Sequence, residues 1–256
     1  MNRKTKAKSA FTLIELVVVV AILTLLFTLL LPARASTRAN VARITCVNNL
    51  KQVGLAFRTW ADAHQARFPM KVADSQGGAA GAVPVAGATA PNVWRIFQVL
   101  SNECKTPKVV VCPADERNPR TNFLNVTVGT TYRDFFDNTA VSYFVGADAD
   151  DTRPQMFLSG DRNIGTGPFN PSSYGYSPST VLGAAVSIGT NTSTGTGANL
   201  QWTDKMHQKQ GNVLLADGSV QQLDSSRLRD ELRRTGDSSA AKYTVISLGG
   251  NNILLP

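Results

Sequence analysis

The chain has 256 residues, of which 26 are basic and 18 acidic, giving a formal net charge of +8. Four of the basic residues lie within the first ten positions, which hold no acid, so the remainder carries 22 basic and 18 acidic groups, a net +4. This small excess argues against a dedicated nucleic-acid-binding protein, whose footprint is a strongly basic patch.

The first long element is the apolar stretch 11–31, FTLIELVVVVAILTLLFTLLL, in which Glu15 is the only charge. A helix of this length reaches roughly 30 Å, the hydrocarbon thickness of a bilayer. The stretch is longer than the apolar core of a signal peptide, and its small-residue junction, Ser9-Ala10, precedes it. A plain signal anchor would not explain Glu15, because a carboxylate in a membrane helix is costly and usually marks a function. The basic residues 1–10 predict a cytoplasmic N-terminus.

The residues around this junction carry a family resemblance. The run 10–16, AFTLIEL, resembles the cleavage and methylation motif of type IV prepilins and type II secretion pseudopilins. The resemblance implies that prepilin peptidase cuts between Ala10 and Phe11 and methylates the new amine of Phe11. It also implies assembly roles for Glu15, which would neutralise that amine within a bundle of such helices, and for Pro32. Ala10 stands where the family usually has Gly.

Beyond Pro32, apolar residues recur at steps of three and four, the pattern of one helical face. We expect one helix over about 12–66, bent near Pro32, whose second half packs one apolar stripe on a globular head. His64 is expected to pack or cap beneath that head. The run 46–69 resembles a helix of the large pilin-like proteins of planctomycetes and verrucomicrobia. The expected stripe comprises Val41, Ile44, Val47, Leu50, Val53, Phe57, Trp60 and Ala61.

The head is expected to contain short helices and strands between irregular segments. Pro91 favours a helix over 92–103, and the β-branched run 108–112, KVVVC, predicts a buried strand. Further strands are expected at 140–145, 155–159, 181–188, 243–248 and 252–255, with a turn at 160–163. Residues 225–234 predict a helix that Gly236 ends.

The sequence contains candidates for a disulfide bond and for a calcium site. Of the three cysteines, Cys104 and Cys112 are the candidate disulfide pair. The acidic loop ADADDT offers Asp148, Asp150 and Asp151 as a calcium site, although it lacks the glycine and closing glutamate of an EF-hand. The alternative interpretation is a solvated acidic loop. Apart from calcium, no cofactor is expected.

The second strong signal lies at 207–223. Two strand-like runs flank Asp217-Gly218, a dipeptide that favours a type I′ hairpin turn. Nine residues separate His207 from Asp217, a spacing that resembles the His–nine–Asp-Gly domain at the C-terminus of many prepilin-like proteins. His207 and Asp217 could form a site for metal or proton chemistry. The structural interpretation, in which Asp217 serves the turn and His207 is hydrogen-bonded near the hairpin, is favoured. No catalytic motif is recognisable.

These observations predict an α+β fold of the type IV pilin kind, a long N-terminal helix on a mainly antiparallel sheet. The expected parts are a leader (1–10), a transmembrane half-helix (11–31), an amphipathic half-helix (32–67) and a periplasmic or extracellular head (68–256). The expected function is that of a non-enzymatic filament subunit, a pilin or pseudopilin. It would start as a single-pass inner-membrane protein and meet prepilin peptidase, other subunits, the assembly platform and the lipid bilayer. The alternatives are a minor or tip subunit, or an anchored binding protein for a surface, cargo or DNA; an enzyme ranks last.

Overall fold

The computed structural model describes residues 11–84, 91–124, 134–166, 173–177, 183–189, 199–236 and 252–256, without the side chains of 29–38. Contacts divide the chain into residues 1–41 and 42–256, and this division falls inside the first helix. The leader with Ala10 and the expected strand 243–248 lie outside the described residues. The helices are α1 (Leu13–Asp62), α2 (Val93–Val99), α3 (Ser101–Cys104) and α4 (Ser225–Arg234), with short 3-10 turns at Pro69–Lys71, Asp74–Gln76, Ala80–Ala82, Pro107–Val110 and Asn138–Ala140.

The described part of the head is built on an antiparallel sheet of six strands in the order β4-β8-β1-β2-β6-β7, beside a two-stranded sheet of β3 and β5. The described chain is therefore α+β, with a long first helix and mainly antiparallel strands, as predicted. The strands are β1 (Tyr143–Gly146), β2 (Phe157–Asp161), β3 (Ile164–Thr166), β4 (Ala184–Ser187), β5 (Leu200–Trp202), β6 (Gln210–Leu215), β7 (Val220–Asp224) and β8 (Asn252–Leu255).

Helix α1 is one continuous helix from Leu13 to Asp62, close to the predicted extent. It continues through Pro32, whose side chain lies outside the described residues. Its end is fixed by His64, whose Nδ1 donates to the Trp60 carbonyl at 2.7 Å and whose ring stacks on the Trp60 indole at 3.6 Å. His64 thus caps the helix, as predicted. Within the part of the chain whose side chains are described, no helix combines the length and hydropathy of a membrane span.

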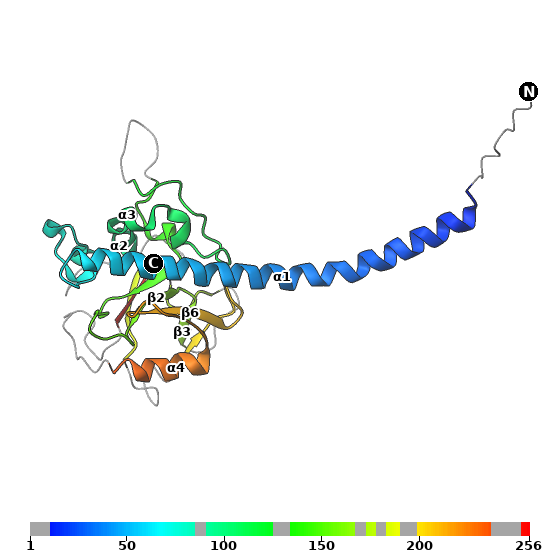
Figure 1. Cartoon of the computed structure of the whole chain (residues 1–256). Coiled ribbons are helices and arrows are strands. Elements are labelled where there is room, and N and C mark those ends of the chain that lie inside the picture. The colour runs from blue at the N-terminus through cyan, green and yellow to red at the C-terminus, as the bar shows by residue number, and fades with distance from the viewer. Residues whose placement is uncertain are drawn as a thin grey trace, which may run out of the picture. The chain divides into compact units, whose positions relative to one another are not determined.

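The part of α1 that belongs to the head packs on one face of the six-stranded sheet. Its buried stripe begins at Cys46, whereas Val41 and Ile44 are exposed, so the predicted stripe starts too early. The helix approaches β6 closely at Gly54, where an added Cβ would lie 2.7 Å from Leu214 Cδ1. The core on this face also contains β1 and β2 side chains. Figure 1 shows α1 passing across the strands on this side.

The other face of the sheet is covered by α4 and the small β3–β5 sheet. Leu228 and Leu232 of α4 share a second core with Phe144, Val213 and other side chains that alternate with those of the first core. Alternation along β6, where Leu214 faces α1 and Val213 faces α4, follows the period of two of a strand. Figure 1 places α4 on the opposite side of the strands from α1. The head is therefore a helix–sheet–helix sandwich.

The prediction of a strand at 108–112 is wrong. Residues Pro107–Val110 form a 3-10 turn, started by Pro107 and by Thr106, whose Oγ1 accepts from the Lys108 amide. Proline suits the first position of a helical turn because its fixed φ matches the helical value. The backbone N–H that proline lacks would have no hydrogen-bond partner at that position in any case. The three valines are nevertheless buried, because the turn is enclosed by the core. Their apolar character predicted burial correctly but not the backbone.

Candidate functional site

The N-terminal candidate site lies at the first turn of α1. Thr12 precedes the helix, and its amide and hydroxyl both donate to Glu15 Oε2, at 2.9 and 2.7 Å. The Glu15 amide donates to Thr12 Oγ1 at 3.4 Å, which completes a reciprocal capping box. Phe11 is 75% exposed and directly precedes this box. The carboxylate of Glu15 is thus held at the helix start, four residues along the chain from Phe11.

The described side chains that follow form an exposed apolar surface around α1. None of the large hydrophobic residues in this set is buried by the rest of the chain, so the surface has no intramolecular partner among the described residues. The set is Leu13, Ile14, Leu16, Val17, Val18, Val19, Val20, Ile22, Leu23, Leu25, Leu26 and Phe27. A surface of this size marks an interaction site.

A second candidate site is a buried group of four side chains that sequence analysis did not bring together. Cys46 comes from α1, Cys112 from the segment after the Pro107–Val110 turn, Asp161 from the end of β2, and His207 from the loop before β6. Their ligand atoms all lie within 4.8 Å of one another, and each residue is at most 3% exposed. We call these four residues the buried tetrad.

The atoms of the buried tetrad are in direct contact. Cys46 Sγ donates to Asp161 Oδ1 at 3.0 Å. The Nε2 atom of His207 lies 3.3 Å from Cys112 Sγ and 3.4 Å from Asp161 Oδ2. One ring nitrogen of His207 therefore faces both a thiol and a carboxylate.

Neighbouring polar groups hold the tetrad in place. The amide and the side-chain Nδ2 of Asn212 both donate to Asp161 Oδ2, each at 2.8 Å. The hydroxyl of Tyr143, which pairs with Asp161 in the β1–β2 ladder, lies 3.5 Å from Cys46 Sγ. Arg43 Nη2 donates to the His207 carbonyl at 2.8 Å. The orientation of the carboxylate is thus set by the sheet itself.

Burial and mutual contacts shift the ionisation of the tetrad. Burial raises the pKa of Asp161, and its hydrogen bonds and His207 offset this only in part. Burial, the Cys112 sulfur and the Asp161 carboxylate raise the pKa of the Cys46 thiol well above its usual value. Burial opposes the charged forms of Cys112 and His207 as well. Even so, contacts with Cys46 and His207 lower the pKa of Cys112, and contacts with Cys112 and Asp161 raise the pKa of His207.

The structure separates the two residues of the His–nine–Asp-Gly spacing. His207 lies in the buried tetrad, whereas Asp217 lies in the turn between β6 and β7, at the far end of the strand. Strand β6, which lies between His207 and Asp217, has six residues and therefore spans roughly 17–20 Å. Asp217 Oδ1 accepts from the Ser219 amide at 2.7 Å, and Gly218 has a φ of +86°, which favours glycine. The hairpin forms as predicted, but its turn is not the expected type I′, because Gly218 has a positive φ and Asp217 does not. No joint His207–Asp217 site exists.

The disulfide predicted between Cys104 and Cys112 is not formed. All three cysteines are free, and Cys112 faces His207 and Cys46. Cys104 is buried at the end of α3, where burial raises its pKa to about 12. The spacing of eight residues gave no information on the path of the chain between the two cysteines, so the pairing could not be derived from it.

The predicted calcium ligands do not converge. Asp148 Oδ2 accepts from the amide and Nδ2 of Asn252, both at 2.7 Å, and so ties the loop to β8. Asp150 Oδ1 accepts from the amide and hydroxyl of Thr152 within its own turn. Among the described residues, Asp148, Asp150 and Asp151 do not form a group that could share an ion. The acidic loop is a structural turn.

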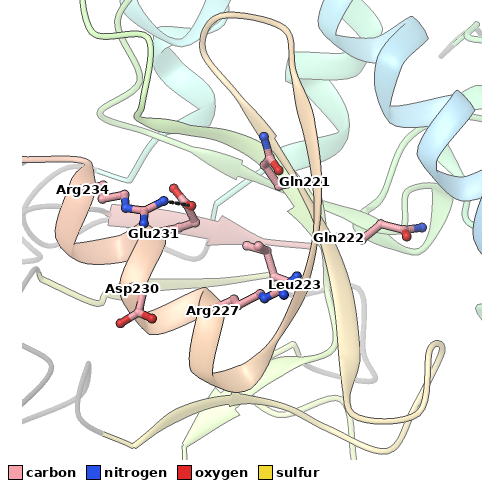
Figure 2. Close-up of a pocket in the computed structure, with 7 residues that line it drawn as sticks. All are labelled: Gln221, Gln222, Leu223, Arg227, Asp230, Glu231 and Arg234. Carbon is pink, nitrogen blue, oxygen red and sulfur yellow. Dashed lines mark hydrogen bonds and ion pairs between the residues drawn. The ribbon is translucent and has the colours of Figure 1, made fainter.

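A polar surface pocket of about 360 Å³ lies between β7 and α4. Figure 2 shows its lining, in which Arg234 is turned toward Glu231. Arg234 Nη1 donates to Glu231 Oε1 at 2.7 Å, so these charges already neutralise each other. No member of the buried tetrad lines this pocket. The arrangement is that of a solvated helix surface and offers no convergent catalytic groups.

The sequence contained little signal for the buried tetrad. Residues 160–163 are predicted from the sequence to form a turn. In the structure, Asp161, Arg162 and Asn163 are buried, each at most 1% exposed. Cys46 falls on the buried stripe of α1, and His207 belongs to a recognised spacing, but nothing in either pattern indicates Asp161. Cys46 and His207 lie 161 positions apart in the chain, so only the folded sheet brings the four residues together.

Comparison with known protein families gives a match at the N-terminus. Residues 5–31 match the family model described as the prokaryotic N-terminal methylation motif. No curated protein and no solved structure matches the chain.

Proposed function

We propose, from the prokaryotic N-terminal methylation motif at residues 5–31, that this chain is processed by prepilin peptidase and assembled as a filament subunit. The chain is of the type IV prepilin and pseudopilin kind at its N-terminus. The filament would be a type IV pilus or a type II secretion pseudopilus. The match at residues 5–31 is the observation that carries the proposal.

The first turn of α1 supports processing at Phe11. The capping box of Thr12 and Glu15 starts the helix directly after Phe11, so the helix would keep its cap after removal of residues 1–10. The new amine would then lie at the positive end of the helix, close to the Glu15 carboxylate. Pairing of Glu15 with the amine of its own or a neighbouring subunit would fix the axial position of each helix, because an unpaired buried charge is strongly unfavourable.

The exposed apolar surface of α1 supports assembly through this helix. The set from Leu13 to Phe27 is not covered by other described parts of the chain. Before assembly, the lipid bilayer of the inner membrane would cover it, with the N-terminus cytoplasmic and the head periplasmic. After assembly, neighbouring subunits would cover it, with the assembly platform extracting each subunit from the membrane. Pro32 would adjust the helix between these two environments.

The geometry of the buried tetrad supports a non-enzymatic role. In a Cys–His–Asp triad, the nucleophile and the carboxylate approach different ring nitrogens. Here Cys112 and Asp161 both approach His207 Nε2, and both are buried. We therefore assign no catalytic residue.

The experiment that tests this function is the intact mass and N-terminal peptide of the full-length chain recovered from its native membranes. The expected product lacks residues 1–10 and begins with a methylated Phe11. An Ala10→Gly variant is expected to be processed at least as completely, and an Ala10→Phe variant to remain uncut. A wild-type chain that still begins at Met1 would exclude prepilin processing.

Assembly is tested separately with Glu15→Val. This variant is expected to be processed but not to enter filaments, measured by the amount of chain in sheared or pelleted filaments. Thr24→Val is the matched control, because Thr24 is a polar residue of the same segment whose hydroxyl only binds carbonyls of its own helix. Normal filament entry of Glu15→Val would contradict the proposed role of Glu15.

A further inference from the structure

The buried tetrad brings together the ligand types of a zinc site from four segments distant in sequence. Two thiols, one imidazole and one carboxylate meet at one point, and all four are at most 3% exposed. Cys, His and Asp are the side chains that bind zinc in proteins, and structural zinc sites have four protein ligands. We propose that Cys46, Cys112, Asp161 and His207 bind one zinc-class divalent cation that joins α1 to the sheet.

The distances between the four ligand atoms fit a tetrahedral ion. Bond lengths of about 2.0–2.3 Å to zinc place tetrahedral ligand atoms roughly 3.3–3.8 Å apart. The contacts from Cys46 Sγ to Asp161 Oδ1 and from His207 Nε2 to Cys112 Sγ and Asp161 Oδ2 are 3.0, 3.3 and 3.4 Å. All pairs are within 4.8 Å. These three contacts lie close to the tetrahedral spacing, and the remaining pairs would have to shorten by at most about 1.5 Å for one ion to bind all four residues.

The direction of His207 distinguishes a metal site from a catalytic one. A single ring nitrogen, Nε2, is directed at the point that the Cys112 and Asp161 side chains also approach. A metal ligand needs this convergence on one point, whereas a proton relay needs the two partners on opposite ring nitrogens.

Groups around the tetrad provide the support that metal ligands need. Asn212 donates twice to Asp161 Oδ2 and so fixes the carboxylate. The Ala114 amide donates to Cys112 Sγ at 3.5 Å, a contact that favours a thiolate. Such contacts orient ligands and tune their basicity.

Charge balance also favours a cation. Binding displaces the thiol protons of Cys46 and Cys112 to solvent, and the proton between Cys46 Sγ and Asp161 Oδ1 is one of them. Two thiolates and a carboxylate around a dication give a net charge of −1, and the dication would offset most of the negative charge that these ligands bring into the buried site. The guanidinium of Arg43 donates to the His207 carbonyl, so its positive charge lies near the site and partly balances this net negative charge.

A surface pocket beside Cys112 gives the side from which an ion would enter. A surface pocket of about 360 Å³ is lined by Cys112 together with Thr45, Asn49 and Pro113. Thr45 and Asn49 lie on α1, within three residues of Cys46. The pocket thus reaches the segment that carries Cys112, although the other three ligands do not line it.

The test begins with the wild-type full-length chain, purified without chelators or metal-affinity resin. Elemental analysis is expected to give one zinc ion per chain, and exchange for Co²⁺ is expected to give the visible absorption of a tetrahedral thiolate site. Alkylation followed by peptide mass analysis is expected to show Cys46 and Cys112 protected until a strong chelator is added. A chain with no bound metal after incubation with Zn²⁺, or one recovered with a Cys46–Cys112 disulfide, would overturn the proposal.

Variants then identify the ligands. Cys112→Ser and His207→Gln each remove one ligand and are expected to lower the zinc affinity more than a hundredfold, beyond the roughly 10–100-fold effect of losing a group that only supports a ligand. Cys104→Ser is the matched control, because Cys104 is also a buried free thiol but lies outside the tetrad. Chelation is expected to lower the Tm of the wild type and of Cys104→Ser, and to leave the Tm of the two ligand variants unchanged. Equal zinc content in Cys104→Ser, Cys112→Ser and His207→Gln would refute the assignment of ligands.

Discussion

The ion pair between Arg162 and Asp115 provides the sharpest test of how the head is stabilised. The Arg162 side chain is 1% exposed and that of Asp115 is fully buried. Arg162 Nε and Nη2 donate to the two carboxylate oxygens of Asp115, at 2.7 and 2.8 Å. Arg162 Nη1 donates to Ser177 Oγ at 3.2 Å, and the guanidinium lies 3.5 Å from the Tyr174 ring centroid. The buried cation therefore depends mainly on one carboxylate.

We predict that Asp115→Asn destabilises the head by about 3–5 kcal/mol, the usual effect of removing one partner of a buried pair. The asparagine keeps the size of the side chain but leaves the buried guanidinium with only the exposed Glu116 carboxylate, 3.6 Å away, as a counter-charge. For a domain of this size the loss corresponds to a fall in Tm of roughly 6–20 °C. Urea unfolding followed by circular dichroism measures it. The surface pair of Asp230 and Arg233, at 2.9 Å with both side chains more than half exposed, provides the control.

The control variant Asp230→Asn is expected to change stability by less than about 1 kcal/mol. The pair also predicts a pH dependence. Burial opposes ionisation of Asp115, but the hydrogen bonds and charge of Arg162 outweigh it and hold the pKa below its usual value. The stabilisation is therefore complete above the unfolded-state pKa and is lost as the pH falls through the lower folded-state pKa. An Asp115→Asn head as stable as Asp230→Asn, with the same acid sensitivity as wild type, would refute this reasoning.

Two further predictions concern packing and the hairpin. Phe57 is fully buried on α1 and lies edge-on to Phe68 and Phe97, with ring centroids 5.9 and 6.2 Å away, so Phe57→Ala is expected to cost about 3–5 kcal/mol in chemical unfolding. A loss below about 1 kcal/mol would show that α1 is not packed on the head as described. Gly218→Val places a β-branched residue at a φ of +86° and is expected to lower the Tm of the head, whereas Asp217→Asn, which preserves the turn, is expected to have little effect. Equal Tm values for the two variants would contradict the turn assignment.

The elements that the sequence predicted well depend on local chemistry. The hairpin follows from Asp217-Gly218 between two strand-like runs, and α4 follows from its capping side chain and its terminal arginines. The cap of α4 is Asp224, one residue earlier than the predicted serine, because its Oδ1 accepts from the Ser226 and Arg227 amides. In each case the interactions that define the element lie within a few residues.

The elements that were predicted incorrectly depend on distant contacts. The valines of KVVVC suggest a strand, but the turn started by Pro107 places them in the core without pairing. The predicted turn at 160–163 is instead a buried polar segment. It is stable there because Arg162 meets Asp115 and Asp161 meets Asn212. No local pattern distinguishes such a segment from a solvated turn.

The sequence by itself determined the N-terminal motif, the long first helix and the α+β class, because these follow from short-range composition, periodicity and turn chemistry. Only the tertiary structure decided which cysteines meet, and what His207 contacts. Cys46, Cys112, Asp161 and His207 lie on four separate segments, and their convergence depends on strand order and on where α1 crosses the sheet. These are properties of non-local packing, which fixes positions in space that spacing along the chain does not encode.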